Sequence, residues 1–369
     1  MSKIICLIML FSGIFFGNAF SESLQEKPSF KTIGYFLGKA EEVDKFDYSK
    51  LTHIIFCFTD LNGNEITFKD SNDEKILKLI VEKKKDFKHL KVMVALGGWS
   101  GCGTCSPVFT TDNNRKIFAK SVRKFIDNYN LDGFDVDWES PVIGGHKNHP
   151  AIPADKDNFT ELIKDLRVAL PSPYEISFAA NSFPDYVFYS IDWKKVIPLV
   201  DFVNLMTYGL PNDKPKHTGH HTALYSSTFQ KESVNSGVQL LDSLEVPLTK
   251  IVIGAAFYGF VVQNVDSANF GLGQIGKSKN SPFYRDIIEE YNEPKGYKLY
   301  WDSTAMAPYL YCFSERTFIT FDNRESVALK TKYAMEKKLG GIMFWRINGD
   351  SYQNGLLEVI NKQVKMSKP

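Results

Sequence analysis

The sequence predicts an α/β fold: a (β/α)8 TIM barrel with an α+β subdomain inserted in the seventh βα loop. Three observations predict it: eight short apolar runs, amphipathic segments between many of them, and one interval far longer than a single helix requires. Short apolar strands that alternate with helices indicate parallel strands covered by helices. Eight such runs favour a closed barrel over a doubly wound sheet, which usually needs fewer strands.

The expected strands and helices follow directly from the periodicity of apolar residues. Amphipathic segments place their apolar residues on one helical face. The expected helices are 73–87, 113–128 and 157–170. The expected strands are 32–36, 53–58, 92–96, 133–138, 175–180, 202–206, 251–256 and 341–345.

The regular spacing breaks once, between residues 256 and 341. This interval contains many Gly, Asn and Tyr residues and two short β-like pieces, 298–301 and 317–321. We therefore expect a barrel whose first part spans 28–259 and whose last part spans 322–365. Residues 260–321 are expected to form the α+β insertion.

The N-terminus has the pattern of a secretory signal peptide. Lys3 precedes an apolar segment at 4–16, and small residues then end at Ala19. The apolar segment is shorter than the roughly 20 residues that span a bilayer, although an N-terminal anchor is the alternative. We expect residues 1–19 to be removed and the protein to be secreted, extracellular or periplasmic, without membrane attachment.

Charge and cysteine content exclude some classes of partner. The chain has 44 Lys+Arg and 43 Asp+Glu, a balance that argues against nucleic acid or an anionic membrane as the main partner. Cys102 and Cys105 lie among Gly, Thr, Ser and Pro, which favours a short loop disulfide over a redox pair. Cys57 lies in an apolar run and is expected to be a buried, small apolar side chain.

Three acidic residues alternate along one expected strand. Side chains alternate between the faces of a strand, so Asp135, Asp137 and Glu139 share one face. In a barrel this face points inward, with Glu139 at the carboxyl end, where barrel active sites lie. Neighbouring carboxylates raise one another's pKa, and a Glu protonated near neutral pH suits a general acid for glycosidic bond cleavage. The alternative, an exposed acidic edge strand, is disfavoured because helical patterns flank this strand on both sides.

The octapeptide at 132–139, DGFDVDWE, matches the DGxDxDWE signature of family-18 chitinases without a mismatch. Other stretches agree in order along most of the chain, each at an expected strand. They are GYF at 34–36, LTHIIFCF at 51–58, ALGGW at 95–99, MTY at 206–208, FYG at 257–259 and GGIMFW at 340–345. The chain thus resembles glycoside hydrolase family 18, in the deep-cleft subgroup with an inserted α+β subdomain.

The resemblance implies a mechanism in which no protein side chain is the nucleophile. Glu139 would protonate the glycosidic oxygen while the substrate's own acetamido oxygen attacks the anomeric carbon, giving an oxazolinium ion that water opens with retention. Asp137 would orient the acetamide, and Asp135 would hold Asp137 and share its proton. Tyr208 would donate its hydroxyl to the acetamide oxygen.

The resemblance also implies a substrate-binding surface, with Trp345 as the apolar floor under the sugar before the scissile bond. For each lining residue alone, packing in the barrel core is nearly as good an explanation. The expected lining residues are Tyr35, Phe58, Gly98, Trp99, Met206, Tyr258 and Trp345.

Two positions depart from the family pattern. Ala95 replaces a small hydroxyl residue, which is expected to loosen the support of Asp135. Gly209 replaces the Asp that in the family lies beside the sugar and near the acid, so substrate binding and the pH optimum are in question.

The predicted function is that of a secreted, retaining, chitinase-type hydrolase of β-linked N-acetylglucosamine polymers or oligomers. Its partners would be chitin or chito-oligosaccharides; no cofactor or metal is needed, and a monomer is expected. Two alternatives use the same fold: an endo-β-N-acetylglucosaminidase acting on N-glycan cores, and a weakly active or inactive chitin-binding lectin.

Two further motifs are better explained as polar loops than as nucleotide-binding or metal-binding sites. Residues 271–278, GLGQIGKS, fit two nucleotide-binding patterns, but a polar loop precedes them and Pro282 interrupts any early helix. His217, His220 and His221 cluster in a loop without an organised set of metal ligands.

Overall fold

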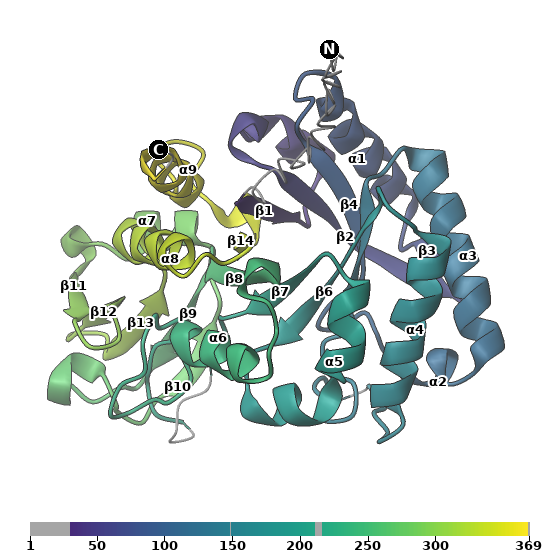
Figure 1. The fold of residues 1–369 in the computed structure, drawn as a ribbon. Helices are drawn as coiled ribbons and strands as arrows, with labels where there is room; N and C mark the ends of the chain where they lie inside the picture. Colours follow the sequence, from purple (N-terminus) through teal and green to yellow (C-terminus); the bar gives the residue numbers. More distant parts are fainter. Residues whose placement is uncertain (1–29, 148, 211–215, 368–369) are drawn as a thin grey trace, which may run out of the picture.

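The computed structural model describes residues 30–147, 149–210 and 216–367 (Figure 1). The predicted signal segment, 1–19, lies outside the described residues.

Eight parallel strands close into a barrel, as predicted. β1 pairs with both β14 and β2, so the sheet has no free edge along these eight strands. Each strand coincides with one of the eight apolar runs. They are β1 (Lys31–Phe36), β2 (His53–Asn62), β4 (Lys91–Gly97), β5 (Gly133–Asp137), β6 (Glu175–Asn181), β7 (Phe202–Met206), β8 (Ile251–Ala256) and β14 (Gly341–Trp345).

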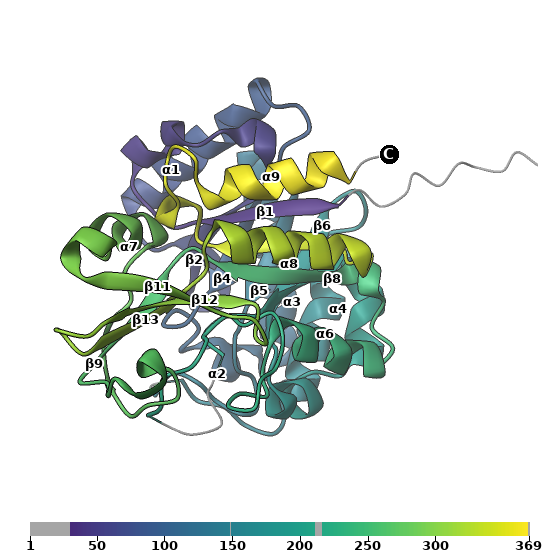
Figure 2. The ribbon, with the colours of Figure 1, turned by 90° about the vertical axis from the view of Figure 1, so that its left-hand side faces the viewer.

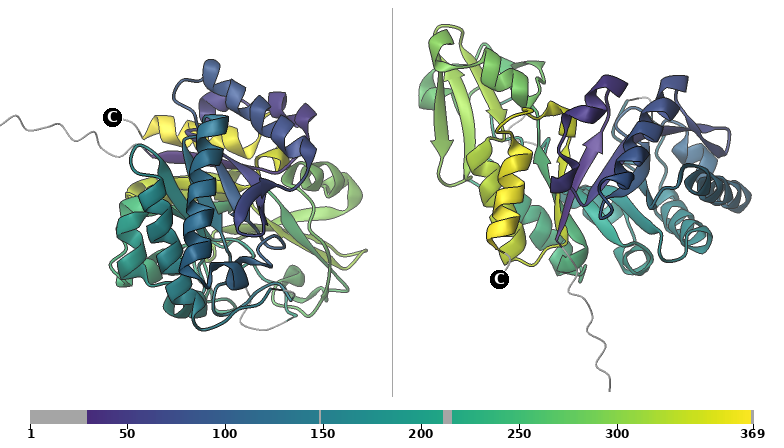
Figure 3. Two further views of the ribbon diagram at one scale, coloured as in Figure 1. Left: turned by 90° about the vertical axis from the view of Figure 1, so that its right-hand side faces the viewer. Right: turned by 90° about the horizontal axis from the view of Figure 1, so that it is seen from above.

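Helices cover the outside of the barrel (Figures 1 and 3). The three predicted helices are confirmed as α1 (Ser71–Glu82), α3 (Asp112–Tyr129) and α4 (Asp155–Ala169). In α3 the side chain of Thr111 caps the first turn, and Asn130 ends the helix in the left-handed conformation. The other helices are α2 (Cys105–Phe109), α5 (Trp193–Val196), α6 (Val234–Ser243), α8 (Arg324–Glu336) and α9 (Leu356–Met366).

One hairpin outside the insertion was not predicted. β2 continues beyond the barrel and pairs antiparallel with β3 (Glu65–Phe68) through a turn in which Gly63 has a φ of +63°. The Ile66 N–H then binds the hydroxyl of Ser121 on α3. The hairpin therefore packs along α3, outside the barrel.

The insertion follows β8, the seventh barrel strand, and ends before α8, as predicted. It is a five-stranded antiparallel sheet in the order β10-β9-β13-β12-β11, and Figures 2 and 3 show it standing beside the barrel. Its first and last strands pair with each other, with Gly259 opposite Phe321. The elements are β9 (Gly259–Gln263), β10 (Lys277–Asn280), α7 (Tyr284–Glu290), β11 (Tyr297–Asp302), β12 (Ala307–Cys312) and β13 (Thr317–Phe321).

A buried ion pair joins the end of this insertion to the barrel. Lys330 on α8 binds both carboxylate oxygens of Asp322, at 2.8 and 2.7 Å, and neither side chain is exposed. Asp322 also accepts the N–H of Ala256, the last residue of β8, at 2.9 Å. The point where the chain returns from the insertion is therefore fixed to β8 and α8 at once.

A second polar cluster lies at the amino ends of the strands. Glu175 at the start of β6 binds His53 of β2 at 2.7 Å and Lys91 of β4 at 2.5 Å. Burial alone would raise the pKa of Glu175, but the hydrogen bonds and charges of these two partners lower it to about 2. Three strands are thus linked by one carboxylate.

The cysteines occupy the predicted kinds of position. Cys102 and Cys105 are joined by a disulfide, with their Cα atoms 5.1 Å apart. Cys57 is a buried free cysteine in the barrel interior.

Candidate active site

A cleft of about 570 Å³ lies at the carboxyl ends of the barrel strands. It brings together nearly all of the residues that the sequence singles out, from strands far apart in the chain. Those that line it are Tyr35, Phe58, Trp99, Asp137, Glu139, Met206, Tyr208, Tyr258 and Trp345.

β5 places its acids as the alternation predicts. Asp135 and Asp137 are buried inside the barrel. Phe134 and Val136 point outward into the core between strands and helices, and Trp138 joins them there against Phe159 of α4. One face of the strand therefore anchors it while the other carries the carboxyl groups toward the cleft.

Asp135 is fully buried beneath the cleft and is held by three donors. Its Oδ1 accepts from Ser177 at 2.5 Å and from Asn204 at 3.2 Å, and its Oδ2 accepts from the Tyr35 hydroxyl at 2.9 Å. Burial raises the pKa of Asp135 to about 6, against these hydrogen bonds, which lower it.

The expected loss of support at Ala95 is therefore compensated. Ala95 lies directly opposite Asp135 in the register of β4 and β5 and has no side-chain donor. Ser177 of β6 and Asn204 of β7 supply donors instead, and neither residue was predicted from the sequence. Asn204 stands two residues before Met206, so the shared strand face could have indicated it.

Asp137 differs from Asp135 in having an unsatisfied oxygen. Its Oδ1 is buried and has no hydrogen-bond partner. Burial raises the pKa of Asp137 well above its usual value, and the charges of Glu139 and then Asp135 raise it further. This carboxyl group can thus hold a proton and accept a hydrogen bond from a ligand in the cleft.

Glu139 is the acid nearest the opening of the barrel. Its side chain is partly buried, and burial raises its pKa to about 7. Its backbone carbonyl accepts the side-chain N–H of Asn181 at 2.8 Å, which fixes the chain just past the end of β5. A carboxyl group with this pKa can donate a proton near neutral pH.

Aromatic side chains form one wall of the cleft. Trp345 stacks on Phe58 at a centroid distance of 5.6 Å and lies 5.8 Å from the ring of Tyr35. Trp99 stands at the rim with 58% of its surface exposed. Such flat apolar faces suit the faces of sugar rings.

Gly98 is placed differently from the expected direct contact with a substrate. It is buried and does not line the cleft; a Cβ atom there would lie 2.4 Å from the Phe58 ring. Its φ of +78° also favours glycine. Gly98 therefore acts by allowing Phe58 to pack.

Tyr208 extends from the end of β7 into the cleft. Its ring meets Tyr258 edge to face at 6.1 Å, and its hydroxyl lies 3.7 Å from the sulfur of Met343. Burial raises the pKa of Tyr208, and Tyr258 and Asp137 add to the shift, so the hydroxyl stays protonated as a donor.

Comparisons with known proteins agree with this geometry. Residues 31–350 match the family described as Glycosyl hydrolases family 18. The chain belongs to this family.

Several relatives of this family-18 chain are named as chitinases. Chitinase A1 of Niallia circulans is 29% identical over 87% of this chain, which spans 57% of that relative's length. Chitotriosidase-1 of Mus musculus is 27% identical, covering 83% of this chain and 68% of the relative. An oviduct-specific glycoprotein of Homo sapiens, whose name denotes no enzyme, is 27% identical over 81% of this chain and 46% of its own length.

Solved structures of the family share the fold. A family-18 N-acetylglucosaminidase from Paenibacillus barengoltzii is 32% identical, with a TM-score of 0.82 over 91% of this chain and 100% of the other. A chitinase from Bacillus thuringiensis is 25% identical, with a TM-score of 0.85 over 92% of this chain and 70% of the other.

Gly209 is a departure from the family pattern that shapes the cleft wall. It has a φ of +64°, and a Cβ atom there would meet nothing nearer than the Tyr258 hydroxyl, at 4.0 Å. Its N–H points to Nδ1 of His221, at 3.5 Å. The missing side chain thus leaves the Tyr258 hydroxyl facing open space in the cleft.

The remaining motifs behave as structural elements of this family-18 barrel. His220 binds Asp302 at 3.1 Å, and burial lowers the pKa of His221 to about 3. No group of three or more potential metal ligands occurs among the described residues. Residues 271–278 run from a 3-10 turn into β10 of the antiparallel sheet, which is not the strand–loop–helix unit of a nucleotide site.

Within the described ranges, no helix is both long and apolar enough to cross a membrane.

Proposed function

We propose that this family-18 chain is a chitinase-type hydrolase that cleaves β-linked N-acetylglucosamine chains with retention, through substrate-assisted catalysis. One observation carries the proposal. Glu139, with a pKa raised to about 7, stands in a sugar-sized cleft next to Asp137, whose Oδ1 lacks a partner. The named chitinase relatives support the same substrate class.

The first step transfers the proton of Glu139 to the glycosidic oxygen. As that C–O bond breaks, the carbonyl oxygen of the substrate's own acetamido group bonds to the anomeric carbon, giving an oxazolinium ion. The leaving chain departs with the proton, and Glu139 is left as a carboxylate.

Asp137 and Tyr208 act on the acetamido group. The unpartnered oxygen of Asp137 accepts the acetamide N–H, which increases the negative charge on the acetamide oxygen and orients it. The Tyr208 hydroxyl donates to the same group and stabilises the charge that develops. Asp135, with a pKa of about 6, holds or releases a proton beside Asp137.

The second step is hydrolysis of the oxazolinium ion. The Glu139 carboxylate takes a proton from water as the water oxygen bonds to the anomeric carbon, and the acetamido oxygen leaves it. Two inversions at the same carbon give overall retention. Trp345, with Phe58 and Tyr35 beside it, forms the floor under the sugar that precedes the scissile bond.

The test is release of a chromophore from an aryl di-N-acetylchitobioside. Glu139→Gln keeps the shape of the side chain but has no proton to give, so kcat/KM should fall at least about 100-fold while ligand binding persists. Near wild-type turnover in this variant would refute the role of Glu139. NMR of the first product formed gives the anomeric configuration, and an inverted product would refute the mechanism.

Three alternatives are separated by the products and by binding. Sizing the products of reducing-end-labelled chitohexaose distinguishes dimer release from the monomer release expected of an N-acetylglucosaminidase. Release of glycans from a glycoprotein, without action on chitin oligomers, would favour an endo-β-N-acetylglucosaminidase. Binding without hydrolysis at any pH would favour a lectin, the alternative that Gly209 raises.

We further propose that the protein is secreted and monomeric. The Cys102–Cys105 disulfide supports an oxidising compartment. Cell fractionation followed by size-exclusion chromatography tests both points, and retention of the protein in the reducing cytoplasm would contradict the first.

A further inference from the structure

The cleft wall between the end of β7 and the start of the insertion has a gap at Gly209. Gly209 lines the cleft, and its φ of +64° favours glycine. Among the described residues, the atom nearest to a Cβ built at Gly209 is the hydroxyl oxygen of Tyr258, at 4.0 Å. The backbone of Gly209 therefore borders the open cleft, with room for a small group against it.

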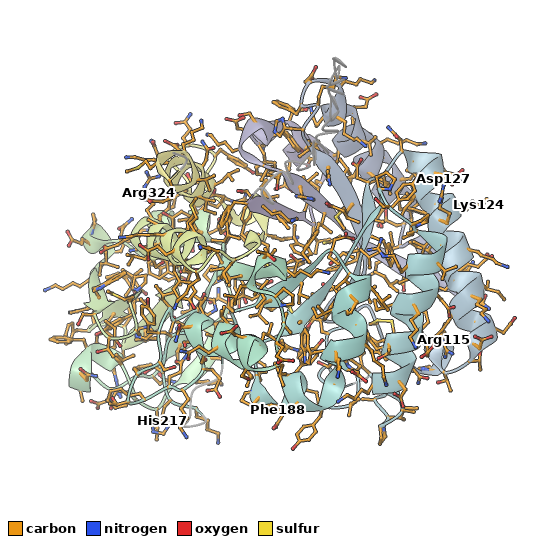
Figure 4. The ribbon with its side chains drawn as sticks, in the orientation of Figure 1. Arg115, Lys124, Asp127, Phe188, His217 and Arg324 are labelled. Carbon is orange, nitrogen blue, oxygen red and sulfur yellow. A yellow bond between two sulfur atoms is a disulfide. The ribbon has the colours of Figure 1, made fainter. Side chains whose placement is uncertain are left out.

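Backbone contacts between the β7–α6 loop and the insertion fix the chain around this gap. The N–H of Leu210 donates to the carbonyl of His221 at 2.9 Å, and the N–H of His221 donates to the Thr320 hydroxyl of β13 at 3.1 Å. His217 of the same loop, labelled in Figure 4, pairs with Ile275 of the insertion in an isolated β-bridge. The gap is thus a feature of an anchored backbone.

The wall around the gap is uncharged. Tyr258, Phe260 and Ser281 line it, with the two ring centroids 5.6 Å apart. His221 packs behind both rings, at 5.1 and 4.6 Å, and burial lowers its pKa to about 3, so its ring is neutral. Among the described lining residues, both carboxyl groups belong to the octapeptide at 132–139. A group in the gap therefore meets an aromatic surface and hydroxyl groups.

The Tyr258 hydroxyl is the polar group that faces the gap. In the part of the chain that the structure describes, this hydroxyl has no hydrogen-bond partner. Burial raises the pKa of Tyr258, and the charges of Glu139 and Asp322 add to the shift, so the hydroxyl keeps its proton and can donate. Since Glu139 acts on Tyr258 in this way, a sugar whose glycosidic bond is held at Glu139 would lie beside the gap.

These features decide which chemical group suits the gap. A carboxylate there would be repelled by the ionised carboxyl groups of the cleft. A small neutral group with a carbonyl oxygen can instead accept the Tyr258 hydroxyl proton, and its apolar end can pack on the Phe260 ring. An acetyl ester on a sugar hydroxyl has this size, this lack of charge and this combination of polar and apolar ends.

We propose that the gap at Gly209 admits an O-acetyl group on the sugar whose glycosidic bond is cleaved. The enzyme then hydrolyses O-acetylated N-acetylglucosamine chains as well as unsubstituted ones. The Tyr258 hydroxyl donates to the ester carbonyl, and the Phe260 ring packs on the methyl group; the ester takes no part in the reaction. This inference rests on the proposed function, since it assumes cleavage at Glu139.

The experiment uses an aryl di-N-acetylchitobioside and its two mono-O-acetyl forms, esterified at O3 or at O6 of the sugar that carries the aryl group. These are the two free hydroxyls of that sugar, so the pair covers every position of the ester. At pH 6, the wild type should cleave one of the esters with a kcat/KM within about fivefold of that for the parent compound. Gly209→Asn should lower this ester-to-parent ratio at least about tenfold, because asparagine tolerates a positive φ and fills the gap.

Two further variants separate the hydrogen bond from the space. Tyr258→Phe keeps the ring and removes the donor, so the ester-to-parent ratio should fall about three- to tenfold. Gly63→Asn is the matched control for the glycine substitution, because Gly63 also has a φ of +63°, and a Cβ there meets nothing within 4 Å. Gly63 lies in the β2–β3 turn, outside the cleft, so this variant should keep the wild-type ratio. Thermal melting checks that each variant is folded.

The outcomes separate the two proposals. If the wild type cleaves both esters more than about fivefold more slowly than the parent, or if folded Gly209→Asn keeps the wild-type ratio, admission of the ester at Gly209 is overturned. An unchanged ratio in Tyr258→Phe overturns the hydrogen bond from Tyr258. A wild type that does not cleave the parent compound overturns the proposed function instead.

Discussion

At the scale of single residues, the site depends on carboxyl groups whose pKa values differ from those in water. Burial is the main cause that raises the pKa of Glu139 to about 7 and the pKa of Asp135 to about 6. A general acid is active in its protonated form, so the sign of the pH dependence follows.

We expect kcat/KM on an aryl chitobioside to fall as pH rises through about 7, because Glu139 then loses its proton. A pH–rate profile measures this fall in kcat/KM at alkaline pH.

Gly209→Asp provides a comparison. A carboxylate in the open space near Tyr258 should repel the charged form of Glu139, which raises the pKa of Glu139 and moves the alkaline fall in kcat/KM to higher pH. An alkaline limb below pH 5.5 in the wild type would contradict the assignment.

The donors to Asp135 give a second prediction. Asn204→Ala and Ser177→Ala each remove one hydrogen bond from a buried acid, and each should lower kcat about 5- to 30-fold by letting Asp135 shift away from Asp137. Ser243→Ala is the control, since Ser243 is exposed and its hydroxyl donates to the carbonyl of Leu240 in its own helix. Unchanged kcat in both Asn204→Ala and Ser177→Ala would show that the Tyr35 hydroxyl alone suffices to hold Asp135.

At the same scale, the acidic residues of β5 could be predicted from the sequence, whereas the residues that support them could not. Asp135, Asp137 and Glu139 could be assigned because strand alternation fixes their common face. Ser177 and Asn204 were missed because one polar residue in an apolar strand shows no periodicity, and its partner depends on the register between strands. Gly98 was expected in contact with substrate, whereas the Phe58 ring packs against it in the structure.

At the scale of elements, the eight strands were predictable because strands buried on both faces are continuous apolar runs. The β2–β3 hairpin was missed because β3 is mostly half-exposed, although Asn62-Gly63 is a recognised turn signal. The order of strands in the insertion could not be predicted, since it depends on pairing between segments as distant as β9 and β13.

The strands of the barrel also give a stability prediction. Glu175 ties β6 to β2 and β4, and its pKa falls to about 2 on folding from an ordinary 4.5. The stabilisation is therefore fully present above about pH 4.5 and is lost as pH falls toward 2. In Glu175→Gln, the free energy of unfolding from urea titrations should be lower at pH 6 and should depend less on pH between 5 and 2.5.

The control is Glu161→Gln, in an exposed pair with Lys164 on α4, which should follow the wild-type curve. Parallel pH curves for wild type and Glu175→Gln would contradict the prediction.

At the scale of the whole molecule, the insertion and the barrel meet at Asp322 and Lys330. Both groups are fully buried, so removing one leaves an uncompensated charge in the interior. Lys330→Met should lower the free energy of unfolding by about 3–5 kcal/mol. Urea unfolding measures this value.

Two further variants test whether the pair itself is responsible. Lys332→Met removes an exposed lysine from the same helix and should change stability by less than about 0.5 kcal/mol. Asp322→Asn combined with Lys330→Met should recover much of the loss, because no charge is left unpaired. A double variant as unstable as the single one would show that packing, and not charge, dominates.

The pairing of Gly259 with Phe321 has a consequence for how such barrels diversify. The chain leaves the barrel at the start of β9 and returns at the end of β13, and these two ends are paired. The distance between β8 and α8 that a connection must span therefore does not depend on whether the insertion or a short turn forms it. Insertions of different size can therefore replace one another at this position without any change in the eight barrel strands. The size of the cleft wall that the insertion contributes changes with it.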